Sequence, residues 1–135
     1  MDLNTYKKYI QILNEELVPA MGCTEPIAIA YAAAKARDVL GTFPESVIVK
    51  CSGNMIKNAR CVTVPNTGDL VGIEASAIIG ILAGKSHRKL EVINEVSEEA
   101  IIKTHELIQS DYCKVEFLDS EIELHIIVDV FNKEE

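Results

Sequence analysis

Residues 70–83 are the feature that most constrains the fold, because nearly every side chain in this segment is apolar or small. The pattern predicts a helix, and Gly84 followed by Lys85 is typical of a helix C-terminus. A helix that is apolar nearly all round has to be buried on most of its sides. One small domain covers such a helix incompletely, so we expect exposed apolar surface along it and homo-oligomers that cover that surface.

The rest of the chain predicts a mixed α/β domain. Its 135 residues, 48% of them hydrophobic, suit a single domain over residues 1–135. Further helices are expected over 3–18, 26–40 and 91–109, and strands over 46–51, 112–118 and 123–131. Residues 55–64 are ambiguous between a helical turn and a short strand. The expected fold is α/β of the mixed α+β type, with several helices packed on a small sheet that ends in a β-hairpin around Asp119 and Ser120.

The composition excludes several classes of function. A net charge of -8 argues against nucleic acid and against an anionic membrane as partners, since both select basic surfaces. The longest apolar stretches fall far short of the roughly 20 residues that span a membrane. The N-terminal residues lack the charged-then-apolar form of a signal peptide. We therefore expect a soluble cytoplasmic protein.

The segment Gly22-Cys23-Thr24-Glu25-Pro26 joins two amphipathic stretches and contains the first cysteine. Pro26 suits the first turn of a helix, and Thr24 or Glu25 can cap the unpaired N–H groups there. A cysteine beside a helix N-terminus is stabilised as a thiolate by those N–H groups and by the helix dipole. Cys23 is therefore a candidate nucleophile, base or metal ligand. The alternative is that Cys23 is a small hydrophobic packing residue, which is the commonest role of a free cysteine.

The other chemically interesting residues carry weaker signals. Cys51, Cys61 and Cys113 lie in strand-like runs without metal-binding spacing, so we expect them to be packing residues and expect no metal site within this chain. Residues 80–86 resemble a phosphate-binding loop, but that match is one residue short and follows an apolar helix. The histidines, at positions 87, 105 and 125, are isolated and are expected to be satisfied or on the surface.

Three polar loops interrupt the apolar elements, over residues 23–25, 52–58 and 66–69. Two of them lead into predicted helices, whose first N–H groups can hold a carboxylate. These loops offer amide and ammonium groups that can bind a carboxylate, and a carboxylate that can bind an amine. This set of groups matches an amino acid zwitterion better than a sugar or a nucleotide. The alternative is that these residues only build turns. The candidate substrate-binding residues are Thr24, Glu25, Asn54, Lys57, Asn58, Thr67 and Gly68.

Three separated motifs carry a resemblance to a known family. Gly22-Cys23-Thr24-Glu25-Pro26, Ser52-Gly53-Asn54-Met55-Ile56-Lys57-Asn58 and Val64-Pro65-Asn66-Thr67-Gly68 resemble, in order and approximate spacing, motifs of the L-cysteine desulfidases. These are also called serine-dehydratase-like α-chain proteins. The resemblance covers nearly the whole chain, but the family enzymes are much longer, and this chain resembles their N-terminal portion.

The resemblance implies a carbon–sulfur lyase that converts L-cysteine to pyruvate, ammonia and sulfide with a [4Fe-4S] cluster. It implies that Cys23 is the base and that the cluster cysteines lie in a C-terminal portion absent here. This chain alone is therefore expected to bind no cluster and to be inactive without that portion or a separate subunit. The chain is then an excised piece, a truncated gene product or one subunit of a split enzyme. The same chemistry on L-serine stays open, as does a non-catalytic amino-acid-binding or partner-docking module.

Overall fold

A computed structural model describes residues 5–13, 24–121 and 125–133 of the chain. The described part contains four strands, four α-helices and one short 3-10 helix. In chain order the elements are β1 (Thr5–Leu13), α1 (Thr24–Leu40), β2 (Ser46–Ser52), α2 (Gly53–Ala59), α3 (Ile73–Ala83), η1 (Ser86–Glu91), α4 (Glu98–Gln109), β3 (Cys113–Leu118) and β4 (His125–Lys133).

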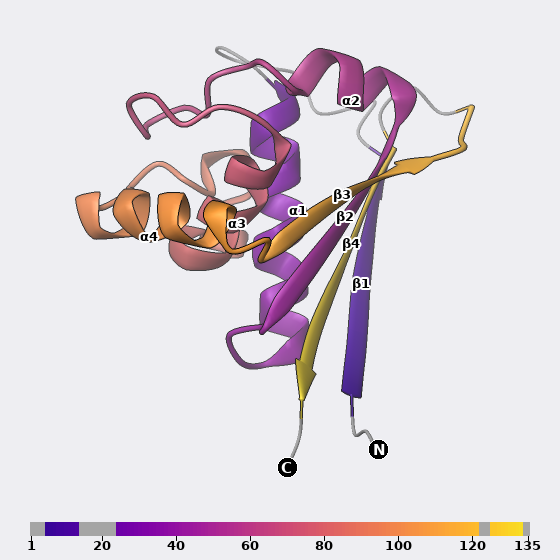
Figure 1. The fold of residues 1–135 in the computed structure, drawn as a ribbon, viewed down its shortest axis with the longest axis horizontal. Helices are drawn as coiled ribbons and strands as arrows, with labels where there is room; N and C mark the ends of the chain where they lie inside the picture. Colours follow the sequence, from indigo (N-terminus) through magenta and orange to yellow (C-terminus); the bar gives the residue numbers. More distant parts are fainter. Residues whose placement is uncertain (1–4, 14–23, 122–124, 134–135) are drawn as a thin grey trace.

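The strands form one mixed sheet in the order β1-β4-β2-β3 (Figure 1). Strand β4 pairs antiparallel with both β1 and β2, whereas β2 and β3 are parallel. All of the helices from α2 to α4 lie in the connection between the two parallel strands, which need such a long crossover. The mixed α+β class expected from the sequence is confirmed.

Residues 5–13 form strand β1, so the helix expected over residues 3–18 is wrong in this part. Tyr6, Tyr9, Ile10 and Leu13 recur at the i, i+3, i+4, i+7 spacing of a helix, and only Ile10, Gln11 and Ile12 alternate as in a strand. Pairing decides between the two, because β1 is in register with β4 from Thr5↔Lys133 to Leu13↔His125. Long-range backbone pairing of this kind overrides a local helical pattern.

The expected β-hairpin between the last two strands is also wrong. Strands β3 and β4 follow each other in sequence, but β2 lies between them in the sheet. Val49 of β2 is in register with Val115 of β3 on one side and with Val128 of β4 on the other. Because β2 supplies a fully buried, β-branched partner for both strands, the two are joined through it rather than to each other.

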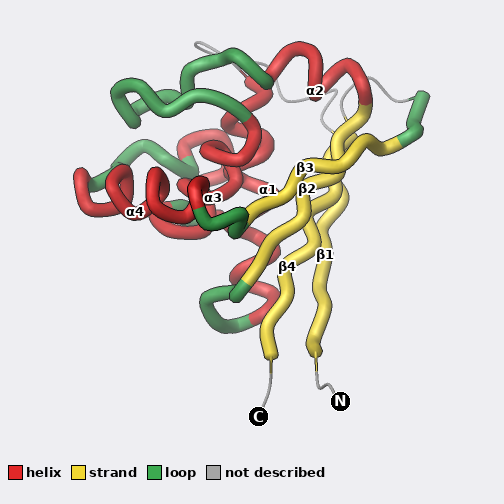
Figure 2. The backbone as a smooth tube through the Cα atoms, in the orientation of Figure 1, coloured by secondary structure: helices red, strands yellow, loops and turns green. Residues whose placement is uncertain are grey.

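The helices cover one face of the sheet (Figure 2). Alternate residues of β2 and β4 point into a core shared with α1 and α3, among them Val47, Val49, Ile126 and Val128. Helix α1 contacts β1 and β4, and α3 contacts β2, β3 and α4. None of the described helices is long and apolar enough to cross a membrane.

Helices α1 and α3 meet at unusually close range because their contact is built from small residues. A Cβ on Gly80 would lie 2.3 Å from the carbonyl oxygen of Ala30, and one on Gly84 would lie 2.8 Å from Cβ of Ala34. The Arg37 guanidinium donates to the carbonyls of Ile81 at 2.8 Å and Gly84 at 2.9 Å, so it caps the C-terminus of α3. These contacts fix α3 against α1.

Helix α3 is buried within this chain, so the expected apolar surface along it is wrong. Its residues from Ala75 to Ile81 are all buried. The sheet, α1 and α4 cover α3. Residues before and after it belong to the same apolar cluster as Ala75 and Ile79 of α3: Val64 and Leu70 in the preceding loop, and Val92 and Ile93 after η1. The expectation failed because small residues let α1 approach α3 closely and because the sheet and α4 cover the other sides of α3.

Candidate functional site

Two of the three predicted polar segments lie at one end of the sheet. Helix α1 begins at Thr24, and α2 follows directly from the end of β2, with Ser52 as its N-cap residue. The two helices are in contact (Figure 1). Glu25, in the first turn of α1, is half-buried. Cys23 lies outside the described residues, and it immediately precedes α1 in the sequence.

The predicted polar residues of the second segment share the solvent side of α2. Asn54, Lys57 and Asn58 are exposed, while Met55 and Ala59 of the same helix are buried in the core. This alternation places an ammonium group and two amides on the outer side of the helix. They are therefore free to bind a polar group approaching this end of the molecule.

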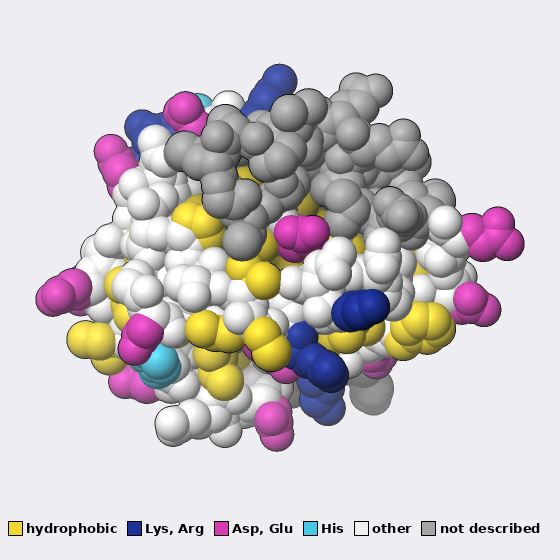
Figure 3. All heavy atoms as spheres, turned by 90° about the horizontal axis from the view of Figure 1, so that it is seen from above, with side chains coloured by type: hydrophobic (Ala, Val, Ile, Leu, Met, Phe, Trp, Pro, Cys, Tyr) yellow, Lys and Arg dark blue, Asp and Glu magenta, His cyan; other side chains and the backbone are white. Residues whose placement is uncertain are grey.

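The surface at this end mixes basic and hydrophobic side chains. Figure 3 looks onto this end, where lysine and arginine side chains lie beside hydrophobic ones and acidic side chains lie among and around them. Arg60, just after α2, is exposed like Lys57, and Phe117 at the end of β3 is 65% exposed. The Phe117 ring lies against Gly53 at the start of α2. The described part of this end can therefore attract an anion and also offers apolar contact.

The third predicted segment lies elsewhere. Thr67 is buried, and its hydroxyl donates a 2.7 Å hydrogen bond to the carbonyl of Val64. Gly68 has φ +79, which a glycine adopts without strain. The amide of Asn66 donates to the carbonyl of Ile93 at 3.1 Å and so ties the turn to the segment before α4, away from α2 (Figure 1). In this arrangement Thr67 and Gly68 shape the turn.

The described cysteines differ in exposure. Burial raises the pKa of the Cys51 thiol to about 12, and burial, followed by nearby Glu74 and Cys51, also raises the pKa of Cys113. Both are therefore neutral thiols at physiological pH and are the packing residues that the sequence predicts. Cys61 is exposed and does not pack as expected, because it follows α2 in an open turn rather than a strand.

The described residues do not fit an iron–sulfur cluster. Across the part of the chain described here, no three histidine, cysteine, aspartate or glutamate side chains gather closely enough to hold a metal ion. Thiolate ligands are also disfavoured at Cys51 and Cys113, whose pKa values are raised by burial. Any cluster of the complete protein would need ligands from outside these residues.

His125, at the start of β4, departs from the expectation of a satisfied histidine. Its Nδ1 lies 2.8 Å from the Ser120 hydroxyl oxygen, in hydrogen-bond contact. Its Nε2 is buried and has no hydrogen-bond partner among the described residues. His87 and His105 are exposed, as expected. No sequence signal distinguishes His125, because its unpaired nitrogen results from the arrangement of the sheet.

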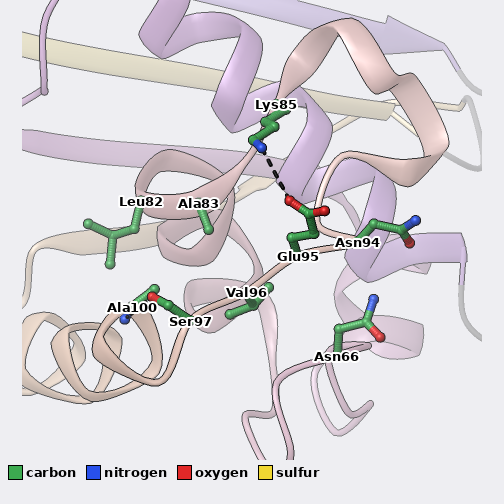
Figure 4. A pocket seen from close by; sticks show the side chains of 9 residues that line it. All are labelled: Asn66, Leu82, Ala83, Lys85, Asn94, Glu95, Val96, Ser97 and Ala100. Carbon is green, nitrogen blue, oxygen red and sulfur yellow. Dashed lines mark hydrogen bonds and ion pairs between the residues drawn. The ribbon is translucent and has the colours of Figure 1, made fainter.

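An open pocket of about 720 Å³ lies between the end of α3 and the start of α4 (Figure 4). Lys85 Nζ and Glu95 Oε1 form a 3.3 Å ion pair at its rim. Asn66 and Asn94 contribute amides, and Leu82 and Val96 contribute apolar surface. Sequence reasoning missed this pocket except for Asn66. Its two charged side chains neutralise each other, so it offers no charge of one sign to a ligand.

The chain is similar to parts of longer proteins. It is 54% identical over 123 residues to a UPF0597 protein of Lachnoclostridium phytofermentans, 48% over 126 residues to one of Treponema denticola and 52% over 131 residues to one of Desulfitobacterium hafniense. These matches cover 91%, 93% and 96% of this chain but only 30%, 29% and 30% of the relatives. The names of these relatives state no reaction or ligand. No family model matches the chain, and no solved structure does.

Proposed function

We propose that this chain is the N-terminal catalytic portion of an L-cysteine desulfidase that releases pyruvate, ammonia and sulfide. The resemblance of its three motifs to that family suggests the reaction. The similarity to UPF0597 proteins more than three times the length of the match supports the view that the chain is one portion of a longer protein.

One observation carries the proposal most directly. Helix α1 begins at Thr24, so the candidate base Cys23 directly precedes a helix of 17 residues. The unpaired N–H groups and the dipole at such a helix start favour a thiolate over a thiol. In contrast, burial keeps Cys51 and Cys113 protonated. Cys61 is exposed, but it lies in a turn after α2 and does not precede a helix. Cys23 is thus the cysteine that we assign as the base.

The proposed reaction is a β-elimination. The Cys23 thiolate takes the α-proton of L-cysteine, the electrons of the broken C–H bond form a Cα–Cβ double bond, and the β-sulfur leaves as hydrosulfide. The resulting aminoacrylate tautomerises to an imine, and water hydrolyses the imine to pyruvate and ammonia. We assign the substrate carboxylate to Lys57, Asn54 and Asn58 on the exposed side of α2. The neighbouring Glu25, at the start of α1, would receive the ammonium group.

The described residues do not offer a site for the [4Fe-4S] cluster that the resemblance implies. A [4Fe-4S] cluster, if present in the longer protein, would be bound by residues beyond this part of the chain. We therefore also propose that the chain is inactive alone.

Replacement of Cys23 by serine tests the assignment of the base. The test protein is a full-length hybrid in which this chain replaces the matching segment of the Lachnoclostridium phytofermentans relative. The Cys23→Ser variant should lose at least about 100-fold in sulfide release, because a hydroxyl is a far weaker base at neutral pH. The matched control Cys61→Ser changes an exposed cysteine after α2 and should keep full activity.

Assays with L-serine beside L-cysteine decide the substrate, since either can undergo the same elimination. Undiminished turnover in Cys23→Ser would contradict the proposed role of Cys23. Binding of L-cysteine without any turnover in the unaltered hybrid would favour a non-catalytic amino-acid-binding module instead.

A further inference from the structure

The face of the sheet opposite the helices has no role in the proposed function. Strand register places alternate residues of β2, β3 and β4 on it. We call it the outer face and define it by the following residues: Ile48, Lys50, Lys114, Glu116, His125, Ile127, Asp129 and Phe131. None of these residues belongs to either hydrophobic cluster that the helices build with the sheet. In Figure 1 helices α1, α3 and α4 lie on the other side, and α2 lies at one end of the sheet.

Lys114 and Glu116 on β3 are exposed as on an ordinary solvated sheet face, but the part of the outer face formed by β2 and β4 is built differently. Ile48, Ile127 and Phe131 are apolar and half-buried, where an antiparallel sheet facing water usually carries polar residues. Among them, Asp129 is only 2% exposed and pairs with Lys50 at 3.2 Å. A buried carboxylate next to a lysine leaves little net charge at the centre of the face. The centre therefore resembles the core of an interface more than a surface.

His125 adds an independent sign that the face is incomplete. Its side chain lies at the end of the outer face where β4 begins, two positions before Ile127. Its buried Nε2 has no partner within the described residues, although buried polar atoms in native proteins nearly always have one. A hydrogen-bonding group from another part of the protein would satisfy it.

The lengths of the relatives indicate what covers this face. They contain more than twice as much chain outside the match as within it. The helix side is already filled, since α3 is buried between α1, the sheet and α4. Of the two faces of the described sheet, the one under the helices is filled, so an additional portion that packs on the sheet would use the opposite face.

We propose that the outer face is the docking surface for the remaining portion of the longer protein. That portion would present a mainly apolar layer to Ile48, Ile127 and Phe131 and a hydrogen-bonding group to Nε2 of His125. This inference rests on the proposal that the chain is one portion of a longer enzyme, but it does not depend on which reaction that enzyme catalyses.

Cysteine labelling followed by mass spectrometry tests the docking surface. Lys114→Cys and Ile48→Cys place thiols on the outer face, and Glu106→Cys places one on the exposed side of α4. Each variant is labelled in the chain alone and in the full-length hybrid described above. We expect Lys114→Cys and Ile48→Cys to label at least about 10-fold more slowly in the hybrid, and Glu106→Cys to label equally in both. Protection of the buried Cys51 reports that each protein is folded.

Equal labelling of the outer-face cysteines in the chain and in the hybrid would overturn the inference. Sedimentation of the chain alone as a dimer, with those cysteines already protected, would also overturn it and assign the face to a second copy. The readout requires no turnover. Protection in a hybrid that releases no sulfide would therefore keep the docking surface and reject only the proposed reaction.

Discussion

Individual cysteines in this chain differ by their surroundings, and this difference decides which of them can react. Cys51 is fully buried in β2, and Cys113 is buried at the start of β3. Desolvation disfavours a thiolate at both positions and raises both pKa values. Cys61 is exposed. The reactivity of each cysteine should therefore depend on its exposure and on its position relative to α1.

We predict a fixed order of alkylation at neutral pH. Cys23 should react first, with a rate that titrates below the free-thiol pKa of about 8.5. Cys61 should follow at the rate of an ordinary exposed thiol, and Cys51 and Cys113 should react only after unfolding. Peptide mass spectrometry over a time course with iodoacetamide measures this order. Labelling of Cys51 before Cys61 in the native protein would contradict the burial on which the argument rests.

The buried thiol of Cys51 should make the protein less stable at alkaline pH. The folded-state pKa of Cys51, about 12, is raised above the unfolded-state value. Its contribution to stability is therefore fully present below about pH 8.5, where both states are protonated, and is lost as the pH rises toward 12. Urea unfolding between pH 7 and 10.5 should show a falling midpoint. Cys51→Ala should flatten this fall, and an identical slope in that variant would show that other groups cause it.

At the scale of elements, the contact between α1 and α3 depends on the absence of a side chain at Gly80. Its Cβ position lies 2.3 Å from the Ala30 carbonyl oxygen, which is part of a rigid helix backbone and cannot yield cheaply. The crossing therefore tolerates no added methyl group, even though alanine is the better helix former.

We predict that Gly80→Ala destabilises the protein by about 1–3 kcal/mol or more, the usual cost of overpacking a core. Gly53→Ala is the matched control, since its added Cβ would lie 3.3 Å from the flexible Phe117 side chain and at a backbone angle open to alanine. Thermal and urea unfolding of both variants measure the difference. Equal stability of the two would show that α1 and α3 do not cross as closely as described.

The elements that could be predicted from the sequence are those with strong local signals. Helix α1 follows from Pro26, and β2 follows from its run of Val47, Ile48 and Val49. Strand β1 could not be predicted, because its apolar residues follow a helical period and only pairing with β4 makes the segment a strand. The position of β2 between β3 and β4 was missed for a similar reason. Strands β3 and β4 follow each other in sequence, and only the assembled sheet shows that β2 separates them.

At the scale of the molecule, the predicted site separates into two parts. Glu25 and the exposed residues of α2 share one end of the sheet, as the clustering of polar loops suggests. Thr67 and Gly68 belong to a turn anchored to Ile93 by Asn66. Sequence spacing cannot reveal this separation, because it depends on how the loop after α2 folds back over α1 and α3. The lack of a partner for Nε2 of His125 among the described residues likewise becomes visible only once the sheet is assembled.

Sulfide release from L-cysteine tests the central claim most directly. It should be compared, under anaerobic conditions, between the chain alone and the full-length hybrid with the Lachnoclostridium phytofermentans relative. The account predicts no release above background from the chain alone, and release of sulfide and pyruvate in equal amounts from the hybrid. Release by the chain alone would contradict the claim that it is one portion of the enzyme. A folded hybrid that releases neither sulfide from L-cysteine nor pyruvate from L-serine would contradict the lyase itself.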